Sequence, residues 1–245
     1  MTPLREFLLA FADDEHLMGQ QHTEWIGVAP FLEEDLAFAS IGQDELGHAV
    51  LLYELVCELD GVEPTDEAID ALAFGRSAAE YRSCELVEYA TTDWAEALVR
   101  HWIYDTAEQL HWQLVENSSY QPLADLAARV EREESYHRRH ADALLDELLA
   151  SDASRVVLLD ALRVISPMVG GLLSPIADVA ELENAGVRAS ASTARASIET
   201  SIGERFGVAF DLGDLGVRGT HRSADFAPLM ARMREVLDLD LTATW

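Results

Sequence analysis

Two Glu-x-x-His motifs, one formed by Glu45 and His48 and the other by Glu134 and His137, are the residues of this sequence best suited to chemistry. Within a helix, positions i and i+3 are neighbours on one face, so the carboxylate and imidazole of each motif can bind one metal ion together. Both residues of the second motif lie 89 positions after their counterparts in the first. The sequence therefore offers two similar metal-binding faces.

An additional acid at a nearly constant distance before each motif is the more specific signal, because Glu-x-x-His alone arises about once by chance in a chain with this many histidines. Glu15 precedes Glu45 by 30 residues, and Asp105 precedes Glu134 by 29 residues. The midpoints of both intervals fall in segments with a proline that favours a turn. Two antiparallel helices joined at such a turn bring the paired acids to the same height, since each helix rises about 1.5 Å per residue. The spacing predicts two helical hairpins with three ligands each.

The third predicted helix offers two acids on one face. Asp105 and Glu108 are three positions apart, and Glu108 also forms a third Glu-x-x-His match with His111. Asp105 preserves the interval of the first hairpin, whereas Glu108 would shorten it to 26 residues, about one turn less. We therefore expect Asp105 to be the ligand, Glu108 to be its alternative and His111 to be structural. In the first helix, Asp14 is a lesser alternative to Glu15.

The predicted metal ligands are Glu15, Glu45, His48, Asp105, Glu134 and His137. Such a set, with Glu-x-x-His on two helices and one carboxylate on each of two others, is typical of di-iron and di-manganese carboxylate bundles. Four carboxylates neutralise two divalent ions, and oxygen ligands with imidazole suit iron or manganese. The chain has only two cysteines, Cys57 and Cys84, which argues against an iron–sulfur cluster or structural zinc. We expect two iron ions, with manganese as the alternative.

Residues beside these ligands carry secondary predictions. Asp13 and Asp14 are expected to be solvated. Asp44 points about 100° away from the ligand that follows it and is a candidate partner for an imidazole. Gly42 and Gly47 have two equally good interpretations: they allow close packing of helices, or they leave space for a ligand beside the site.

Histidines outside the two motifs have weaker assignments. His16 and His22 are expected to be surface residues or ordinary core residues. His140 follows the second motif by three positions, and a place beside the metal site is its less favoured assignment.

Apolar residues at helical spacing predict helices over residues 3–26, 30–59, 91–116 and 121–149, with Thr92 as the expected cap of the third. Residues 61–90 are expected to form a connector with a short helix after Pro64, and further helices are expected near 153–165, 189–206 and 224–236. No segment shows the sustained alternation of a strand. The predicted fold is all-α: one ferritin-like domain over residues 1–245, with a four-helix bundle in 1–150 and a helical layer in 151–245.

The charge of the chain limits its partners. The formal net charge is −28, and all 17 basic residues are arginine, which argues against binding to nucleic acid or to an anionic membrane. Two cysteines form no disulfide framework and suit a reducing compartment. No signal peptide and no apolar run near the roughly 20 residues of a membrane span are visible. Cytoplasm is the expected location.

Four segments carry a family resemblance: EWIGVAP at 24–30, QDELGH at 43–48, SYQPLA at 119–124 and EREESYHRRH at 131–140. They resemble the phenylacetate-degradation oxygenase family, which comprises the catalytic and structural subunits of phenylacetyl-CoA epoxidase. The ligand-bearing segments are similar to the catalytic subunit, and Asp105 matches the family pattern. The short chain and the run at 216–245 are similar to the structural subunit, which typically lacks metal ligands, whereas this sequence keeps a full set.

The resemblance implies a di-iron monooxygenase that epoxidises the ring of phenylacetyl-CoA or a similar aromatic acyl-CoA. It also implies an external reductase and a related larger oxygenase subunit, in a dimer or hetero-oligomer. Two alternatives stay open: a non-catalytic structural subunit of that oxygenase, and a stand-alone di-iron or di-manganese oxidase with another substrate.

Overall fold

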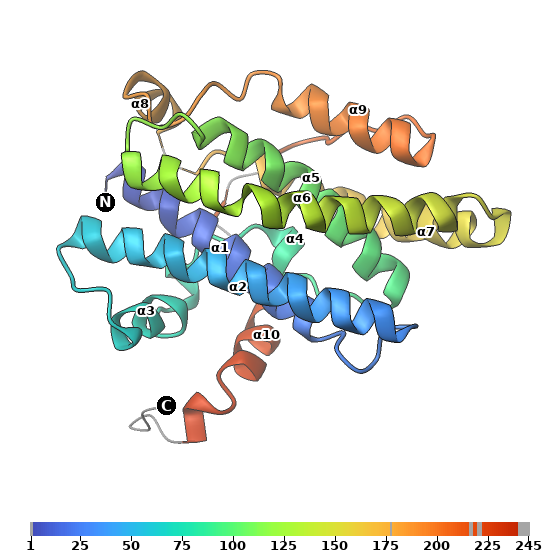
Figure 1. The fold of residues 1–245 in the computed structure, drawn as a ribbon, viewed down its shortest axis with the longest axis horizontal. Coiled ribbons are helices and arrows are strands. Elements are labelled where there is room, and N and C mark those ends of the chain that lie inside the picture. The colour runs from blue at the N-terminus through green and yellow to red at the C-terminus, as the bar shows by residue number, and fades with distance from the viewer. Residues whose placement is uncertain (1, 177, 216–217, 220–221, 240–245) are drawn as a thin grey trace.

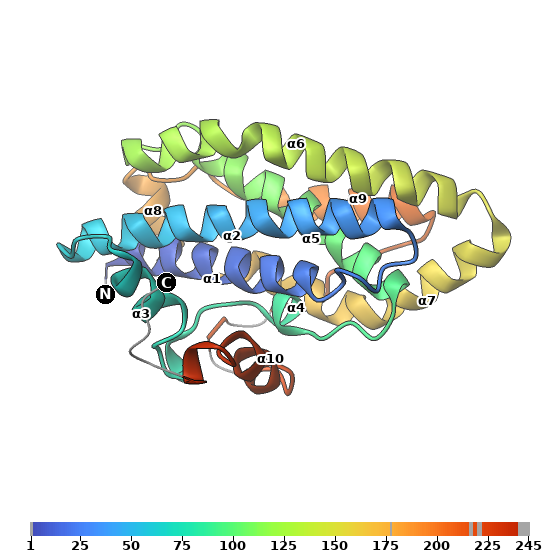
Figure 2. The same ribbon diagram turned by 60° about the horizontal axis from the view of Figure 1, so that its bottom comes forward.

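Four long helices run side by side through the protein, as Figures 1 and 2 show for this computed structural model. They are α1 (Pro3–Thr23), α2 (Leu32–Asp60), α5 (Trp94–Val115) and α6 (Gln121–Leu149). The structure describes residues 2–176, 178–215, 218–219 and 222–239, and within these ranges every regular element is a helix. The predicted all-α fold is confirmed.

Local sequence signals explain where these helices begin and end. The Thr2 hydroxyl accepts a hydrogen bond from the Arg5 amide at the start of α1, a position where a side-chain cap replaces missing backbone partners. Gly61, with φ 68°, ends α2 in the left-handed conformation that glycine adopts without steric cost. The cap of α5 is Asp93, whose carboxylate accepts from the Glu96 amide at 2.9 Å, and not the expected Thr92.

Close contact between α1 and α2 depends on two glycines. A Cβ atom on Gly42 would lie 3.0 Å from the Gly19 carbonyl oxygen and 3.1 Å from the His22 Cβ. A Cβ atom on Gly19 would in turn lie 2.9 Å from a carbon of Leu46. Gly47 has no atom within 4 Å of such a position. Gly42 therefore serves helix packing, whereas Gly47 lies on the outer face of α2.

The remaining elements cover the bundle on two sides (Figure 2). The connector after α2 forms α3 (Asp66–Ala73), η1 (Ala78–Glu80) and α4 (Glu85–Glu88). The C-terminal part forms α7 (Asp152–Val169), η2 (Gly170–Leu173), α8 (Val179–Asn184), α9 (Ala194–Phe206), α10 (Phe226–Met233) and η3 (Leu237–Leu239). Helices α7 and α9 pack against α5, and α8 packs against α1. The three expected C-terminal helices correspond to α7, α9 and α10, whereas α8 was not expected.

The helical segment 152–173 differs from the expectation that no part of the chain could span a membrane. Its most apolar stretch has a mean hydropathy of 1.8, and its 22 residues are long enough to cross a bilayer by length and composition. Asp160 and Arg163 interrupt the apolar residues, which is why the run is not obvious in the sequence. Buried Leu158, Leu162 and Ile165 belong to the main hydrophobic core. A core helix passes the same test, so the segment is only a weak indication of a membrane span.

Buried ion pairs join α1 to distant parts of the chain. Asp13 pairs with Arg76 of the connector, and Asp14 pairs with Arg218. Both acids are almost inaccessible, with 0% and 3% of their surface exposed, so the expectation that they are solvated is wrong. Glu88 is likewise buried and pairs with Arg222. The C-terminal segment therefore neutralises acids that lie inside the N-terminal half.

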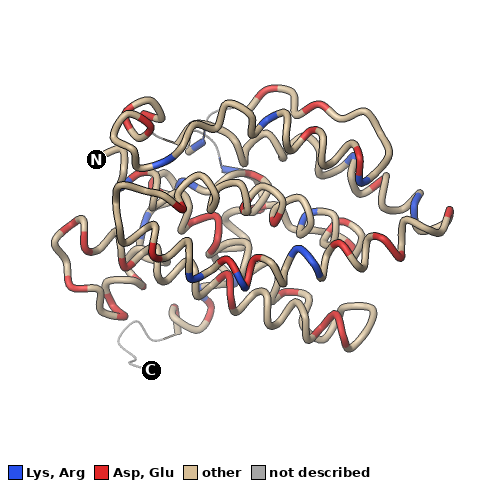
Figure 3. The backbone as a smooth tube through the Cα atoms, turned by 45° about the horizontal axis from the view of Figure 1, so that its top comes forward, with Lys and Arg blue, Asp and Glu red and all other residues tan. Residues whose placement is uncertain are grey.

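Acidic residues are spread along all parts of the described chain, as Figure 3 shows.

The division into a bundle at 1–150 and a layer at 151–245 stays a prediction. Of the run at 216–245 that carried part of the family resemblance, residues 216–217, 220–221 and 240–245 lie outside the described ranges.

Candidate metal centre

Four metal-binding side chains from three helices meet at the centre of the bundle. Glu15 of α1, Glu45 and His48 of α2, and Glu108 of α5 each offer one ligand atom, and these atoms all lie within 4.8 Å of one another. His48 Nδ1 lies 3.4 Å from Glu15 Oε2 and 4.0 Å from Glu108 Oε1. All four residues are buried.

Helix α6 extends this cluster with its Glu-x-x-His motif. Glu134 Oε1 lies 3.4 Å from His48 Nδ1 and 3.8 Å from His137 Nδ1. His137 Nδ1 also lies 3.6 Å from Glu45 Oε1. Glu45 and Glu134 are thus the carboxylates that lie near both imidazoles, and the two motifs face each other as their spacing predicts.

Both acids of the third predicted ligand helix are buried inside the bundle. Glu108 belongs to the four-residue group with His48, whereas Asp105 Oδ1 lies 3.2 Å from His101 Nδ1, one turn earlier on α5. Nearby His137 carries the largest electrostatic effect on Asp105 after burial itself. Glu108 therefore lies beside His48, and Asp105 lies beside His101. The choice between them as ligand stays a prediction.

Among the residues that the structure describes, many ligand atoms of the cluster have no hydrogen-bond donor directed at them. Within the described chain, ten side-chain atoms of the cluster have no hydrogen-bond partner. They are both carboxylate oxygens of Glu45, Asp105 and Glu134, one oxygen each of Glu15 and Glu108, and Nδ1 of His48 and His137. Buried polar atoms without partners are costly. A pair of metal ions would bind these atoms and offset the carboxylate charges, so the donor set fits such a site.

Burial and mutual repulsion act on the acids of this cluster. Burial and the charge of Glu108 raise the pKa values of Glu15, Glu45 and Glu134 well above the ordinary range of a glutamate. Burial also raises the pKa of Asp105 well above its ordinary value. Close carboxylates cannot all ionise without a compensating cation. In the absence of metal, these acids therefore retain protons at pH values where isolated carboxylates have lost them.

Acids at the edge of the bundle orient the two imidazoles. His48 Nε2 lies 2.8 Å from Glu133 Oε2, and His137 Nε2 lies 3.3 Å from Asp44 Oδ2. Each contact occupies Nε2 and leaves Nδ1 directed at the cluster, an arrangement common among metal-binding histidines. The prediction that Asp44 partners an imidazole is confirmed. Glu133 was missed, although it occupies the position before the second motif that is equivalent to Asp44 before the first.

Aromatic donors hold two of the carboxylates. The Tyr104 hydroxyl donates to Glu15 Oε1 at 3.1 Å, and the Trp112 Nε1–H donates to Glu108 Oε1 at 2.9 Å. Each acid therefore keeps one oxygen fixed and the other free. Neither donor was identified from the sequence.

A second group of histidines lies beyond Asp105 along the bundle. His22 Nε2 lies 3.2 Å from His101 Nδ1, and His140 Nε2 lies 3.1 Å from Glu34 Oε2. Burial lowers the pKa of His101 to about 3, so this imidazole is neutral at pH 7. The ring centroid of His140 lies 5.9 Å from that of His101, and its place beside the metal site stays a prediction. The i,i+4 spacing of His101 and Asp105 was the available signal for this group.

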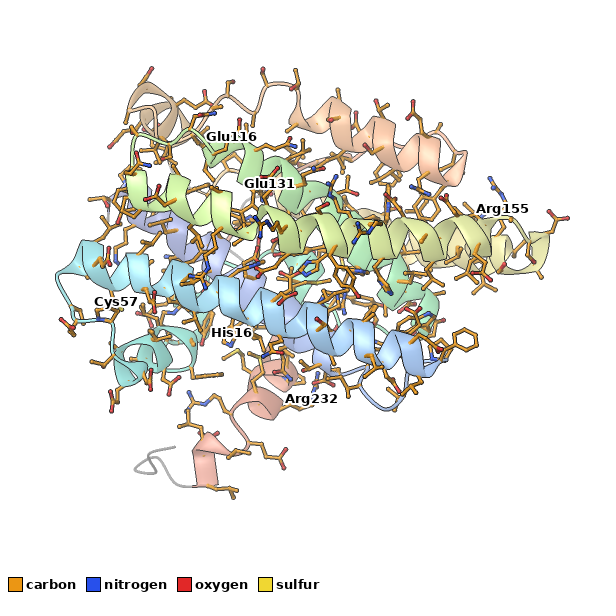
Figure 4. All side chains as sticks on the ribbon, in the orientation of Figure 1. His16, Cys57, Glu116, Glu131, Arg155 and Arg232 are labelled. Carbon is orange, nitrogen blue, oxygen red and sulfur yellow. The ribbon has the colours of Figure 1, made fainter. Side chains whose placement is uncertain are left out.

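A cavity between α5 and α6 gives access to the cluster. Its volume is about 280 Å³, and it reaches Glu134 and Trp112. Glu116 and Glu131, labelled in Figure 4, lie along its outer part. The cluster is therefore enclosed by four helices and approached from the α5–α6 side.

Comparison with known proteins gives one consistent assignment. Residues 1–245 match the protein family described as phenylacetic acid catabolic protein. Two different subunits of the 1,2-phenylacetyl-CoA epoxidase of Escherichia coli (strain K12) are similar to this chain. One is 34% identical over 149 residues, which cover 60% of this chain and 58% of that relative. The other is 29% identical over 140 residues, which cover 57% of this chain and 43% of that relative.

These alignments are partial, whereas the family match is not. The chain spans about half the length of the curated relatives that it matches. The match to the family, in contrast, extends over all of residues 1–245. This protein therefore belongs to the phenylacetic acid catabolic protein family.

Proposed function

We propose that this chain is a subunit of a di-iron monooxygenase that epoxidises the ring of phenylacetyl-CoA, or of a similar aromatic acyl-CoA, in phenylacetate catabolism. The observation that carries the proposal is the group of buried ligand atoms from four helices that have no hydrogen-bond partner among the described residues. Membership of the family and the names of both curated relatives support it.

The six residues predicted from the sequence would hold the two metal ions. They are Glu15, Glu45, His48, Asp105, Glu134 and His137, which would supply four carboxylates and two imidazoles. Glu108 adds a fifth carboxylate, one more negative charge than two divalent ions neutralise. Because Asp105 preserves the interval of the first hairpin, we expect Glu108 to be less important for metal binding than Asp105.

Two ferrous ions would supply the reduction and activation of dioxygen, and manganese is the alternative metal. The chain itself supplies position and shielding. Glu133 and Asp44 orient the imidazoles, and Tyr104 holds Glu15. The buried helix faces keep bulk water away from the ions. The α5–α6 cavity would admit the ring of the substrate beside Glu134.

Other proteins would complete the reaction. Electrons would come from an external reductase, and a related larger oxygenase subunit would assemble with this chain in a dimer or hetero-oligomer in the cytoplasm. Glu116 and Glu131 line the α5–α6 cavity together with one arginine, Arg138, so the acids outnumber the cations there. An excess of negative charge disfavours the phosphates of coenzyme A, so we expect the partner protein to supply most of the cationic part of the acyl-CoA site.

A non-catalytic structural subunit of the same oxygenase is the second candidate function. The chain is 34% identical over 149 residues to the first epoxidase relative and covers 58% of it. It is 29% identical over 140 residues to the second and covers 43% of it. These shares mean that the better-matching relative is the shorter of the two, and a short chain is what the structural role predicts. In that case the ligands would persist without a catalytic role. A stand-alone di-iron or di-manganese oxidase is the third candidate, which activity of the isolated chain would support.

Metal analysis is the direct test. The chain would be purified from cells supplied with both iron and manganese, and its metal content would be measured by inductively coupled plasma mass spectrometry. Two ions per chain, lost in His48→Ala and His137→Ala variants with unchanged helicity, are the expected result. A metal-free chain that still stabilises a separate oxygenase protein would instead establish the structural role. Epoxidation without any second bundle protein would establish the stand-alone enzyme.

A further inference from the structure

A separate cavity of about 260 Å³ lies on the other side of α1 and α5 from the metal cluster. Asp14 and His111 line this cavity, whereas their neighbours in sequence, Glu15 and Trp112, belong to the metal cluster. The opposite wall comes from the C-terminal part of the chain, in residues 172–176, in Val179 and in the segment 188–195. The cavity is therefore closed only when the C-terminal part packs on the bundle.

Most of the cavity wall is apolar. Phe7 and Phe11 of α1, Leu114 of α5, and Leu172 and Val179 of the C-terminal part contribute to it. The volume lies below the roughly 300–1,000 Å³ of sites for drug-sized molecules, so a ligand would be smaller than a drug. Apolar walls of this kind favour a hydrocarbon ring or chain, since burying its surface removes it from water.

Arg188 is the uncompensated charge at this cavity. The other two arginines that line it are paired, Arg218 with Asp14 and Arg195 with Glu199. Arg188 forms no ion pair with any residue that the structure describes.

The surroundings of Arg188 leave its guanidinium without an anion. It lies 5.9 Å from the ring centroid of Phe7, and its Nε donates a long hydrogen bond of 3.4 Å to the Ala189 carbonyl oxygen. Burial lowers the pKa of Arg188, which the more distant charge of Glu183 opposes. An arginine in a protein nevertheless keeps its charge. A half-buried cation without a partner is unfavourable, and an anion in the cavity would correct this.

We propose that this cavity is a binding site for a small apolar monocarboxylate, with the carboxylate on the Arg188 guanidinium and the hydrocarbon part between Phe7, Phe11 and Leu172. Guanidinium and carboxylate match in planar, two-bond geometry. A dianion such as phosphate does not fit, because the cavity offers a single unpaired cation and little polar surface. The site is distinct from the metal centre and does not depend on the function proposed for it.

Binding to the metal-free full-length chain tests the site directly. The probes are 3-phenylpropionate, the aliphatic acid heptanoate and the neutral isostere 3-phenylpropionamide, measured by isothermal titration calorimetry and saturation-transfer NMR. We expect 3-phenylpropionate to bind one-to-one with a Kd of about 1 mM or lower. The amide should bind at least about tenfold more weakly, because it lacks the charge-assisted hydrogen bonds. Tighter binding of 3-phenylpropionate than of heptanoate would identify an aryl acid as the ligand. Equal binding of the two would show that the site accepts both aryl and aliphatic acids.

Variants separate the charge from the cavity. Arg188→Met should weaken both acids by about tenfold or more and leave the amide unchanged. Arg163→Met is the matched control, since Arg163 is exposed on α7 and pairs with the likewise exposed Asp160. Ala194→Leu, at a buried alanine in the wall, should abolish binding of all three probes. Arg188 is half-buried and unpaired, so its variant should fold even if Ala194→Leu does not.

Three results would overturn the proposal. They are the absence of binding by either acid at about 10 mM, equal affinity for the acid and the amide, and unchanged acid affinity in Arg188→Met.

Discussion

Replacing Arg218 by methionine should destabilise the protein by an amount that depends on pH. The Arg218 and Asp14 side chains are only 2% and 5% exposed, and breaking such a buried pair costs about 3–5 kcal/mol when the remaining charge stays unpaired. Asp14 can avoid this by binding a proton, because burial already raises its pKa. The destabilisation at neutral pH should therefore lie near the upper end of that range and should decrease in acid.

The sign follows from the raised pKa of Asp14 in the folded state. The ordinary pKa of an aspartate is 3.8. Protonation of Asp14 in the folded state therefore contributes its full stability below about pH 3.8, and this contribution is lost as the pH rises towards the pKa of Asp14 in the folded protein. Each pH unit in this window corresponds to about 1.4 kcal/mol. Because Arg218 lowers the pKa of Asp14 and its removal raises this pKa further, the difference in stability between wild type and Arg218→Met should grow with rising pH, by at most about 1.4 kcal/mol per pH unit. The contribution from lost carbonyl hydrogen bonds of Arg218 does not change with pH.

Urea denaturation at pH 5, 6 and 7, followed by circular dichroism, measures this difference. The control variant Arg163→Met removes an exposed arginine and should change stability by less than about 0.5 kcal/mol at every pH. A loss in Arg218→Met that is below about 1 kcal/mol and constant with pH would mean that Asp14 is not desolvated as the structure indicates.

Four further results are expected. His48→Ala should abolish stoichiometric metal binding while leaving the far-ultraviolet circular dichroism unchanged, because the apolar helix faces do not depend on metal. Asp105→Ala should lower metal content more than Glu108→Ala, and the opposite ranking would place the α5 ligand one turn later. Metal binding at pH 7 should release protons, because burial raises the pKa values of the cluster acids, so affinity should rise with pH; titration calorimetry in buffers of different ionisation enthalpy measures the release, and its absence would contradict the pKa argument. Gly42→Ala should destabilise the fold by about 1–3 kcal/mol, whereas Gly47→Ala should stabilise it by about 0.5–1 kcal/mol, as urea denaturation would show.

The long helices and the meeting of the two motifs could be predicted because both follow from local spacing. The interval from Glu15 to Glu45 fixes the position of the first turn, and the helix expected at 121–149 coincides with α6. The first helix ends at Thr23 and not at residue 26, because the chain turns at Gly27 with φ 82°. Periodicity does not reveal such a turn, since Trp25 and Ile26 continue the apolar pattern.

Contacts between distant segments could not be predicted. Asp13 and Asp14 resemble solvated acids in the sequence, because their partners lie 63 and 204 positions away. Asp105 and Glu108 share one helix face, so the sequence ranks them only by hairpin spacing, and both prove to be buried. No sequence pattern marks Arg188 as a binding residue, because its cavity forms between α1, α5 and the C-terminal segments, which are distant in the sequence.

The arginines of the C-terminal segment also set an order of events during synthesis. Asp14 leaves the ribosome 204 residues before Arg218, which at 5–20 residues per second is about 10–40 s earlier. Glu88 likewise leaves the ribosome 134 residues before its partner Arg222. During this interval Asp14 on α1 and Glu88 on α4 lack their arginine partners, so the ion pairs that join them to the C-terminal segment cannot yet form. A nascent chain should therefore be more sensitive to proteases before Arg218 and Arg222 emerge than after both ion pairs have formed.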